Sequence, residues 1–357
     1  MDKKELQTYA DKLKNLELER PIRIMEVCGT HTTQFFYTGV KDLFPEKLSL
    51  IDGPGCPVCV TPNRYLDRAI EIARTHEVWL VTFGDMMRVP SSYSSLQKEK
   101  AVGVPIHIVY SPLDALTLAQ ENPEKQVVFL SVGFETTIPT EAVAVKKARQ
   151  EKLKNFSILT GNKLTPPAVR ALLDAGEVKI DGFILPGHVS VITGIKGWRF
   201  VADKYEKPCV ITGFETQNLL IGTMALIHLI QNGNPEIINE YSQVVTESGN
   251  EKAQEVMAEV FESTEAKWRG IGTIPESGLC LKEPFQEFDA NLRFPVNPPE
   301  EVEPRGCRCG EVLRGLVTPL DCPLFGKKCL PETPVGACMV SSEGACAAYF
   351  RYQKVSP

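Results

Sequence analysis

The feature that most constrains the fold is a unit that occurs eight times between residues 21 and 232: a short apolar run, a turn rich in Gly, Pro or Cys, and a helical segment. The apolar runs are nearly continuous and rich in β-branched residues. Such runs are typical of parallel strands buried on both faces and joined by helices. They lie at residues 22–27, 48–51, 78–83, 106–110, 127–132, 156–160, 182–186 and 209–212. The chain is therefore predicted to be an α/β protein.

Eight units fit two architectures. One is a (β/α)₈ barrel, which also has eight strands. The other is a pair of similar doubly wound parallel-sheet lobes, over residues 21–120 and 121–232. We favour the two lobes, because the second set of units begins and ends with nearly the same phrase, GFETT and GFETQ. Both architectures place the turns at the carboxyl ends of the strands, where ligands bind.

Two further regions flank the repeated units. Residues 1–20 form a charged, amphipathic pattern that predicts an N-terminal helix. Residues 233–357 are predicted to be a small irregular and helical region, with a helix over 235–263 and a Pro-rich irregular stretch after it. Six cysteines occur between residues 307 and 346, where apolar residues are too few for folding by burial alone. A bound metal is expected to hold this region together.

Charge and hydropathy limit which kinds of partner and which cellular compartment we expect for the chain. The net charge of -6 comes from interspersed acidic and basic residues, and no basic stripe indicates a nucleic-acid partner. The longest apolar run, residues 219–230, is shorter than the ~18 residues of a membrane span and predicts a buried core helix. The N-terminus does not resemble a signal peptide. We therefore expect a cytoplasmic protein without a membrane span, in which 11 cysteines indicate metal or redox chemistry.

Three cysteines follow the first two predicted strands. Cys28 ends the first strand in the segment CGTHT, and His31 follows it as a candidate base or hydrogen-bond donor. Cys56 and Cys59 follow the second strand in GPGCPVC, just before a helix. A helix N-terminus favours the thiolate. If the two strands are neighbours, the three sulfurs converge on one cleft, where they could bind a metal with an open position or where two could cycle as a disulfide.

The second lobe contributes polar groups at its own strand ends. Glu135, His188 and Glu215 follow predicted strands in GFETT, PGHVS and GFETQ. We expect these side chains, Glu135 and His188 above all, to face the cysteine cleft. Cys209 and Cys280 are solitary and are expected to be structural.

The spacing of the six C-terminal cysteines is C-x-C-x₁₂-C-x₆-C-x₈-C-x₇-C. Zinc sites usually show paired knuckles, which are absent here. Scattered single cysteines among Gly and Pro suit an iron–sulfur cluster better. A cubane cluster takes four thiolates, so two of the six cysteines remain and could form a redox dithiol.

Five motifs in the expected order, CGTHT, GPGCPVC, GFETT, LPGHVS and the cysteine-rich end, give the chain a resemblance to the hydrogenase maturation protein HypD family from about residue 21 to 352. The resemblance implies two α/β lobes and a [4Fe–4S] region. It also implies a scaffold on which the Fe(CN)₂CO group of nickel–iron hydrogenases is assembled. The expected partners are the small chaperone HypC and the cyanide carrier HypE.

The resemblance also implies roles for individual cysteines. Cys28, Cys56 and Cys59 match the essential cleft cysteines, which hold the Fe(II) that receives cyanide and CO or cycle electrons. The implied cluster ligands are Cys307, Cys322, Cys329 and Cys346. The implied redox dithiol consists of Cys309 and Cys338. On this basis the chain is a redox scaffold and not a stand-alone enzyme. The alternatives are a thiol–disulfide oxidoreductase with an iron–sulfur cluster that acts on protein substrates, and an inert iron-binding scaffold.

Overall fold

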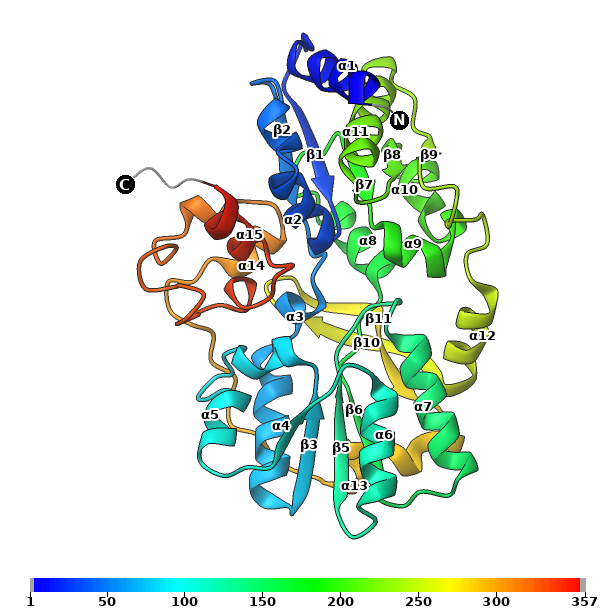
Figure 1. Ribbon diagram of the computed structural model, residues 1–357, viewed down its shortest axis with the longest axis vertical. Coiled ribbons are helices and arrows are strands. Elements are labelled where there is room, and N and C mark those ends of the chain that lie inside the picture. Colours follow the sequence, from blue (N-terminus) through cyan, green and yellow to red (C-terminus); the bar gives the residue numbers. More distant parts are fainter. Residues whose placement is uncertain (1–2, 354–357) are drawn as a thin grey trace.

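The computed structural model describes residues 3–353 and contains two separate parallel sheets, an antiparallel hairpin and a cysteine-rich region (Figure 1). The hairpin lies between the two sheet-containing lobes, and the cysteine-rich region lies beside it. The α/β prediction is confirmed. The strands do not close into one barrel, so the (β/α)₈ alternative is wrong.

The first sheet, which we call sheet A, has five parallel strands. In spatial order they are β2 (Leu48–Asp52), β1 (Ile22–Glu26), β7 (Gly182–Leu185), β8 (Cys209–Ile211) and β9 (Ile237–Asn239). The second sheet, sheet B, has four parallel strands. They are β4 (Ile106–Ile108), β3 (Val78–Thr82), β5 (Gln126–Ser131) and β6 (Phe156–Thr160).

The chain visits the two sheets in an order that the repeated units did not reveal. It lays down β1 and β2 in sheet A, builds all of sheet B, and then returns to sheet A for β7, β8 and β9. The expected boundary between residues 120 and 121 is therefore corrected, because β3 pairs with β5 across it and β3 and β4 thus share one sheet with β5 and β6. The reason is that strand pairing is a long-range choice, whereas the period of the sequence reports only that a strand forms.

Helices connect and cover the strands. The α-helices are α1 (Lys3–Lys14), α2 (Gly29–Tyr37), α3 (Pro57–Val60), α4 (Asn63–Thr75), α5 (Leu96–Ala101), α6 (Pro112–Glu121), α7 (Ile138–Gln150), α8 (Thr165–Ala175), α9 (Gly187–Thr193), α10 (Arg199–Asp203), α11 (Thr216–Asn232), α12 (Glu251–Val260), α13 (Ala290–Arg293), α14 (Cys309–Leu313) and α15 (Ala345–Tyr352). Short 3₁₀ helices are η1 (Val40–Leu43), η2 (Gly84–Arg88), η3 (Ile195–Trp198), η4 (Glu283–Phe288), η5 (Pro319–Asp321) and η6 (Ala337–Met339).

The apolar segment 219–230 forms a core helix, as expected. It lies within α11, where Leu219, Leu226 and Ile230 are buried in the same cluster as Ile24 of β1. Helix α1 joins this cluster through Leu13, which is completely buried. Among residues 3–353, no helix has both the length and the apolar character needed to cross a membrane.

The segment after sheet A differs from its prediction. Only α12 is helical within the expected helix 235–263, and β9 precedes it. The chain then forms an antiparallel hairpin of β10 (Phe261–Trp268) and β11 (Gly272–Leu281), which the sequence interpretation missed. Glu, Ala and Lys in β10 favour helix locally. The pairing with β11 and the burial of Phe261 and Trp268 at the two ends of β10 outweigh that preference.

Candidate functional site

Cys28 lies between the end of β1 and the start of α2. Its backbone N–H donates to Glu26 Oε2 over 2.7 Å, and its side chain is buried. The backbone N–H groups of Thr30 and His31 point to the sulfur and favour the thiolate. Burial, together with the charges of Glu26 and Glu343, outweighs them and raises the pKa of Cys28 to about 12. The thiol is therefore protonated at neutral pH unless a cation or a metal binds it.

The two cysteine turns are packed directly on each other. Gly29 donates its N–H to the carbonyl of Gly55 over 3.0 Å. A Cβ atom at Gly55 would lie 2.3 Å from the Cys28 nitrogen and 2.5 Å from its Cα, so only glycine allows this approach. The neighbouring pairing of β1 and β2 brings the turns together, as the sequence predicted.

Cys56 and Cys59 are joined in a disulfide across the single turn of α3. Cys56 is the N-cap residue, its sulfur accepts the N–H of Cys59 over 3.2 Å, and the two Cα atoms are 5.3 Å apart. Pro57 occupies the first helical position, where its missing N–H costs nothing. Both cysteines are buried, and α3 lies between the two lobes (Figure 1).

The six C-terminal cysteines, which are far apart in the sequence, line one small pocket. Four of the six side chains are hydrogen-bonded in series: Cys307 to Cys309, Cys309 to Cys338, and Cys338 to Cys346. The hydrogen bond to Cys307, followed by the one to Cys338, lowers the pKa of Cys309 well below its usual value. The hydrogen bond to Cys309 raises the pKa of Cys338. The pocket is therefore lined by neighbouring sulfur atoms, which are soft donors for a metal. Cys209 and Cys280, which were expected to be structural, do not line it.

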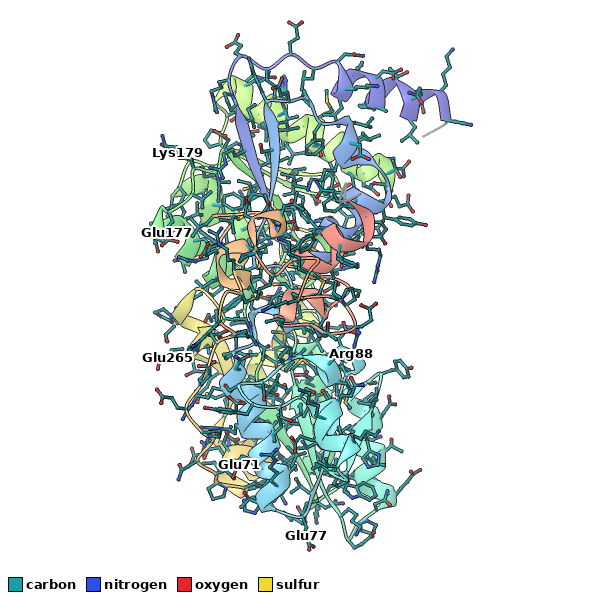
Figure 2. The ribbon with its side chains drawn as sticks, turned by 90° about the vertical axis from the view of Figure 1, so that its left-hand side faces the viewer. Glu71, Glu77, Arg88, Glu177, Lys179 and Glu265 are labelled. Carbon is teal, nitrogen blue, oxygen red and sulfur yellow. A yellow bond between two sulfur atoms is a disulfide. The ribbon has the colours of Figure 1, made fainter. Side chains whose placement is uncertain are left out.

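The cysteine-rich region packs on both cysteine turns. Helix α15 contacts α2, and η6, which carries Cys338, contacts α3. Thr30 Oγ1 donates to Glu343 Oε1 over 2.7 Å, which ties the CGTHT turn to the loop before α15. Arg88, labelled in Figure 2, donates to the carbonyls of Pro331 and Val340 and ties the region to the sheet-B lobe.

An open groove of about 660 Å³ leads to the disulfide turn. It is lined by Pro57 and Val58 of α3, by the loops after β3, β4 and β5, and by the loop of residues 341–343. In sheet B, β3 is followed by β4 on one side and β5 is followed by β6 on the other side, so the strand order reverses between β3 and β5. Parallel α/β sheets bind ligands at such a switch point. A partner or substrate can therefore approach the α3 helix from this side.

The two candidate histidines meet on one aromatic ring. His31 is buried, its Nε2 lies 3.2 Å from the carbonyl oxygen of Gly213, and its ring stacks on Phe214 at 4.6 Å between centroids. His188 stacks on the same ring at 4.0 Å. Burial lowers the pKa of His31 to about 4, so it is neutral at physiological pH. Its Nδ1 has no hydrogen-bond partner within residues 3–353.

Two expectations about the second lobe are wrong. His188 is the second residue of α9, which follows β7 of sheet A. It therefore belongs to the same lobe as Cys28 and does not face it from another lobe. Glu135 lies in the sheet-B lobe, and its carboxylate accepts both the N–H and the hydroxyl of Thr165 over 2.7 and 2.8 Å. It thereby anchors the start of α8. Glu215 is the N-cap residue of α11 and is exposed.

The sequence interpretation missed a buried charged group beneath the cysteine turns. Glu26 and Asp52 are paired at the last positions of β1 and β2, and both are buried. Burial raises the pKa of Asp52 to about 6 and that of Glu26 well above its usual value. The Lys41 amine contacts the rings of Phe36 and Tyr349 and donates to the Tyr349 hydroxyl over 2.9 Å. The available signal was an acidic residue near the end of each of the two strands that precede a cysteine turn.

The six-cysteine pocket gathers the largest set of sulfur side chains in the part of the chain that the structure describes. As the side chains stand, no three His, Cys, Asp or Glu residues between 3 and 353 are arranged around a metal position. Soft sulfur donors in the pocket nevertheless match the donor set of an iron–sulfur cluster. The pocket therefore contains side chains of the kind that bind such a cluster, but they are not arranged around a metal position.

Fold and site together define a class: a two-sheet α/β protein in which a buried disulfide turn is packed against a pocket lined by cysteines. Comparison with known proteins places the chain within that class. It belongs to the HypD family, because the family model HypD, described as "Hydrogenase formation hypA family", matches residues 4–353. It is thus a hydrogenase maturation factor.

Curated relatives are similar over nearly their whole length. The "Hydrogenase maturation factor HypD" of Escherichia coli (strain K12) is 45% identical over 337 residues, which cover 94% of this chain and 90% of the relative. The "Hydrogenase expression/formation protein HupD" of Azotobacter chroococcum mcd 1 is 46% identical over 340 residues, with 93% and 90% covered. The HypD of Rhodobacter capsulatus is 46% identical over 341 residues, with 94% and 90% covered.

Proposed function

We propose that the protein is the redox-active scaffold on which the Fe(CN)₂CO group of nickel–iron hydrogenase is assembled. One observation carries the proposal: the helix with the Cys56–Cys59 disulfide is packed against the segment that presents Cys338 to the six-cysteine pocket. A disulfide next to a set of soft sulfur donors is suited to a transfer of electrons from one sulfur centre to the other.

In this proposal the pocket holds a [4Fe–4S] cluster through Cys307, Cys322, Cys329 and Cys346. The cluster, when bound, supplies electrons one at a time. The remaining cysteines, Cys309 and Cys338, form the redox dithiol. They are adjacent in the series of cysteine side chains, as are Cys307 and Cys309, and Cys338 and Cys346. Since disulfide formation needs two sulfurs in contact, an adjacent pair is better suited to the role than a separated one.

The iron that receives cyanide and CO is the cargo of the scaffold. Reduction of the Cys56–Cys59 disulfide takes up two electrons and two protons and yields two thiols. These thiols and Cys28 are then the soft ligands that hold low-spin Fe(II). Glu26 positions Cys28 by accepting its backbone N–H over 2.7 Å. Burial of the three sulfurs keeps water from the site.

Polar groups near the turns have supporting roles in the proposal. His31 is neutral at physiological pH, so it can accept a proton or donate a hydrogen bond without adding charge to the site. His188 is more exposed and shares the Phe214 ring with His31, so it is placed to exchange protons with solvent. Glu135 has a structural role at Thr165 and no assigned role in the transfer of cyanide.

The proposed partners are the small chaperone HypC and the cyanide carrier HypE, and the proposed compartment is the cytoplasm. The groove beside Pro57 and Val58 is the route by which a carrier would reach the disulfide turn. A protein that acts on cargo delivered by other proteins needs such an open approach, because its sulfurs are otherwise buried.

A second candidate function is a thiol–disulfide oxidoreductase that acts on protein substrates. The observation that favours it is the Cys-x-x-Cys disulfide across a helix start. The two functions differ in their substrates. Reduction of a generic protein disulfide by the isolated chain would favour the oxidoreductase and count against the scaffold.

The deciding experiment is anaerobic purification with the small chaperone, followed by infrared spectroscopy for bound cyanide and CO. The scaffold predicts bands of both ligands in the complex with the native chain. It also predicts their loss in Cys56→Ser and Cys59→Ser, with the visible absorption of the cluster retained. Loss of the cluster absorption in these variants would show that the two cysteines are cluster ligands and that the division proposed above is wrong.

A further inference from the structure

Arg269 is a buried arginine that the proposed function does not use. It lies in the turn between β10 and β11, far from both cysteine turns in the sequence, and its side chain is 3% exposed. An arginine is always charged, so its burial is costly unless its donors are satisfied. Its partners therefore indicate what it is there to hold.

The partners of Arg269 are concentrated at the C-terminal end of the disulfide helix. Nε and Nη2 both donate to the carbonyl of Thr61 over 3.0 and 2.7 Å, and the backbone N–H donates to the carbonyl of Val60 over 2.8 Å. Nη1 donates to Asn63 Oδ1 over 2.6 Å at the start of α4. One residue thus satisfies the end of α3 and links it to the next helix.

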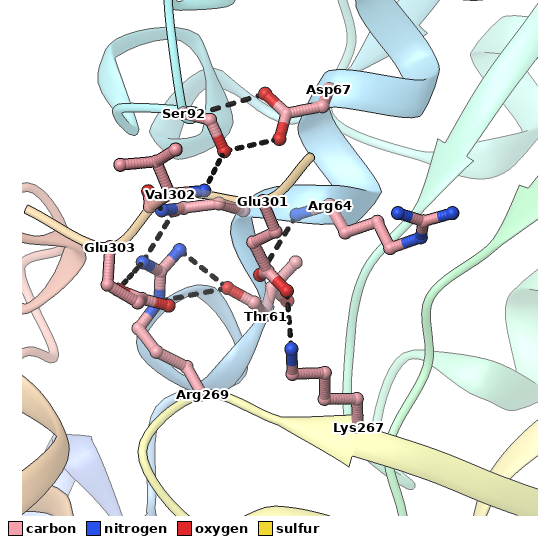
Figure 3. Close-up of polar contacts among 10 residues, drawn as sticks. Thr61, Arg64, Asp67, Ser92, Lys267, Arg269, Glu301, Val302 and Glu303 are labelled. Carbon is pink, nitrogen blue, oxygen red and sulfur yellow. Dashed lines mark hydrogen bonds and ion pairs between the residues drawn. The ribbon is translucent and has the colours of Figure 1, made fainter. Parts of the chain in front are cut away.

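The same side chain reaches the segment that enters the six-cysteine pocket. Arg269 Nη1 lies 3.4 Å from Glu303, four residues before Cys307 (Figure 3). The following residue is also in contact with this region, since a Cβ atom at Gly270 would lie 2.1 Å from the Cα of Gly310. The hairpin turn is therefore wedged between the disulfide helix and the cysteine-rich region.

Helix α3 is also held by the burial of Val58, Cys59 and Val60 and by the Thr61 hydroxyl, which donates to the carbonyl of Pro57 over 2.8 Å. It is a single turn, and its N-terminal end is capped by the sulfur of Cys56 itself. Reduction of the disulfide removes the covalent link across this turn. The bonds that Arg269 makes to Val60 and Thr61, at the other end of the helix, then help to keep Cys56 and Cys59 close.

We propose that Arg269 is a positioning residue for the Cys56–Cys59 pair: it keeps the two thiols close in the reduced protein, so that the disulfide forms readily again. The proposal rests on the proposed function in that the pair cycles during maturation. The physical quantity is the effective concentration of the two thiols. It is obtained from the equilibrium constant of the exchange with glutathione. In this exchange the protein disulfide and two glutathione thiols give two cysteine thiols and glutathione disulfide, and two electrons pass to the protein.

The test measures this equilibrium in the full-length chain under anaerobic conditions. The protein is equilibrated in glutathione buffers at pH 7, its thiols are alkylated, and the peptide that contains Cys56 and Cys59 is quantified by mass spectrometry. We expect Arg269→Gln to lower the effective concentration by about tenfold, which is ~30 mV for a two-electron couple. Arg269→Lys should lose nearly as much, because an ammonium cannot reproduce the planar fork that contacts Thr61 and Asn63.

Arg293→Gln is the matched control. Arg293 also bonds backbone carbonyls, those of Phe156 and Lys154, but at the amino ends of the sheet-B strands and away from the sulfurs. It should lower the melting temperature and leave the glutathione equilibrium unchanged. A folded Arg269→Gln variant with an effective concentration within about twofold of the native value would overturn the proposal, as would an increase or full rescue by Lys.

Asn63→Ala keeps the proposal testable if Arg269→Gln does not fold. It removes one of the groups that orient the guanidinium and should lower the effective concentration by about threefold. No change in this variant would also overturn the proposal. The measurement does not depend on hydrogenase maturation, so the two failures are distinguishable. An unchanged glutathione equilibrium in these variants contradicts this inference, whereas the absence of cyanide and CO bands from the native complex contradicts the proposed function.

Discussion

At the scale of single residues, the site is shaped by groups that burial holds in their neutral forms. Cys28 and His31 are the clearest cases, since burial raises the pKa of the first to about 12 and lowers that of the second to about 4. Neither carries a charge at neutral pH until a ligand or partner changes its surroundings. A bound iron would supply such a change for Cys28, because a metal favours the thiolate.

The role of Cys28 can be tested by Cys28→Ala in the complex with the small chaperone. We expect the infrared bands of cyanide and CO to be lost, because the iron loses a sulfur ligand, while the visible absorption of the cluster persists. Cys209→Ala is the control, since Cys209 is buried in β8 and does not line the six-cysteine pocket. Unchanged bands in Cys28→Ala would remove this cysteine from the proposed iron site.

Glu141 provides a test of the pH dependence of stability away from the cysteines. It is completely buried and accepts hydrogen bonds from Ser131 and Asn162, and burial raises its pKa from 4.5 to about 7. Between these values the folded chain binds a proton that the unfolded chain has lost. The free energy of unfolding therefore falls as pH rises through this window, by up to about 3 kcal/mol.

Glu141→Gln should remove that contribution. We expect urea unfolding of the variant to depend less steeply on pH between pH 4.5 and 7 than that of the native chain. The exposed residue Glu265, on the hairpin strand β10, offers the control Glu265→Gln, which should leave the slope unchanged. Equal slopes for the native chain and Glu141→Gln would show that this carboxyl does not bind a proton in the folded state.

At the scale of elements, the approach of the two cysteine turns depends on glycine. A side chain at Gly55 would overlap the backbone of Cys28. We expect Gly55→Ala to lower the free energy of unfolding by roughly 2 kcal/mol, because the overlapping atoms belong to the backbone and cannot rotate away. Chemical denaturation measures the loss.

Gly84→Ala is the control for this prediction. Its Cβ atom would meet only a methyl group of Ile108, at an ordinary contact distance of 3.7 Å. It should change stability by less than about 0.5 kcal/mol. If both glycine variants were equally stable, the close packing of the GPGC and CGTHT turns would not matter for folding.

At the scale of the whole molecule, the cysteine-rich region depends on two other parts of the chain for its position. It contacts α2 and α3, and Arg88 ties it to the sheet-B lobe. It contains few regular elements of its own. We infer that its order depends on the proposed cluster and that the two lobes fold without it.

The double variant Cys322→Ala, Cys346→Ala tests this dependence. We expect loss of the cluster absorption and faster hydrogen exchange in residues 305–350, because two of the proposed ligands are removed. Exchange in the strands of sheets A and B should remain slow. A full cluster in this variant, shown by iron and sulfide analysis with Mössbauer spectroscopy, would contradict the proposed ligands. Unfolding of both lobes would contradict their independence.

The sequence by itself determined the local structure and the chemical groups. The apolar runs predicted eight strands, and all eight form, because each buried parallel strand needs a continuous run of apolar residues. The glycines and cysteines also predicted where the reactive turns lie. Cys28, Cys56 and Cys59 come together because consecutive strands β1 and β2 are also neighbours in space.

Only the tertiary structure decided which distant segments meet. The return of β7 to pair with β1 moved His188 into the lobe of Cys28, and Glu135 became the anchor of α8. Arg269 reached the disulfide helix from a hairpin that local preferences concealed. The physical reason is that pairing between strands, packing of a turn and burial of a charge depend on groups far apart in the chain, which no local pattern of residues specifies.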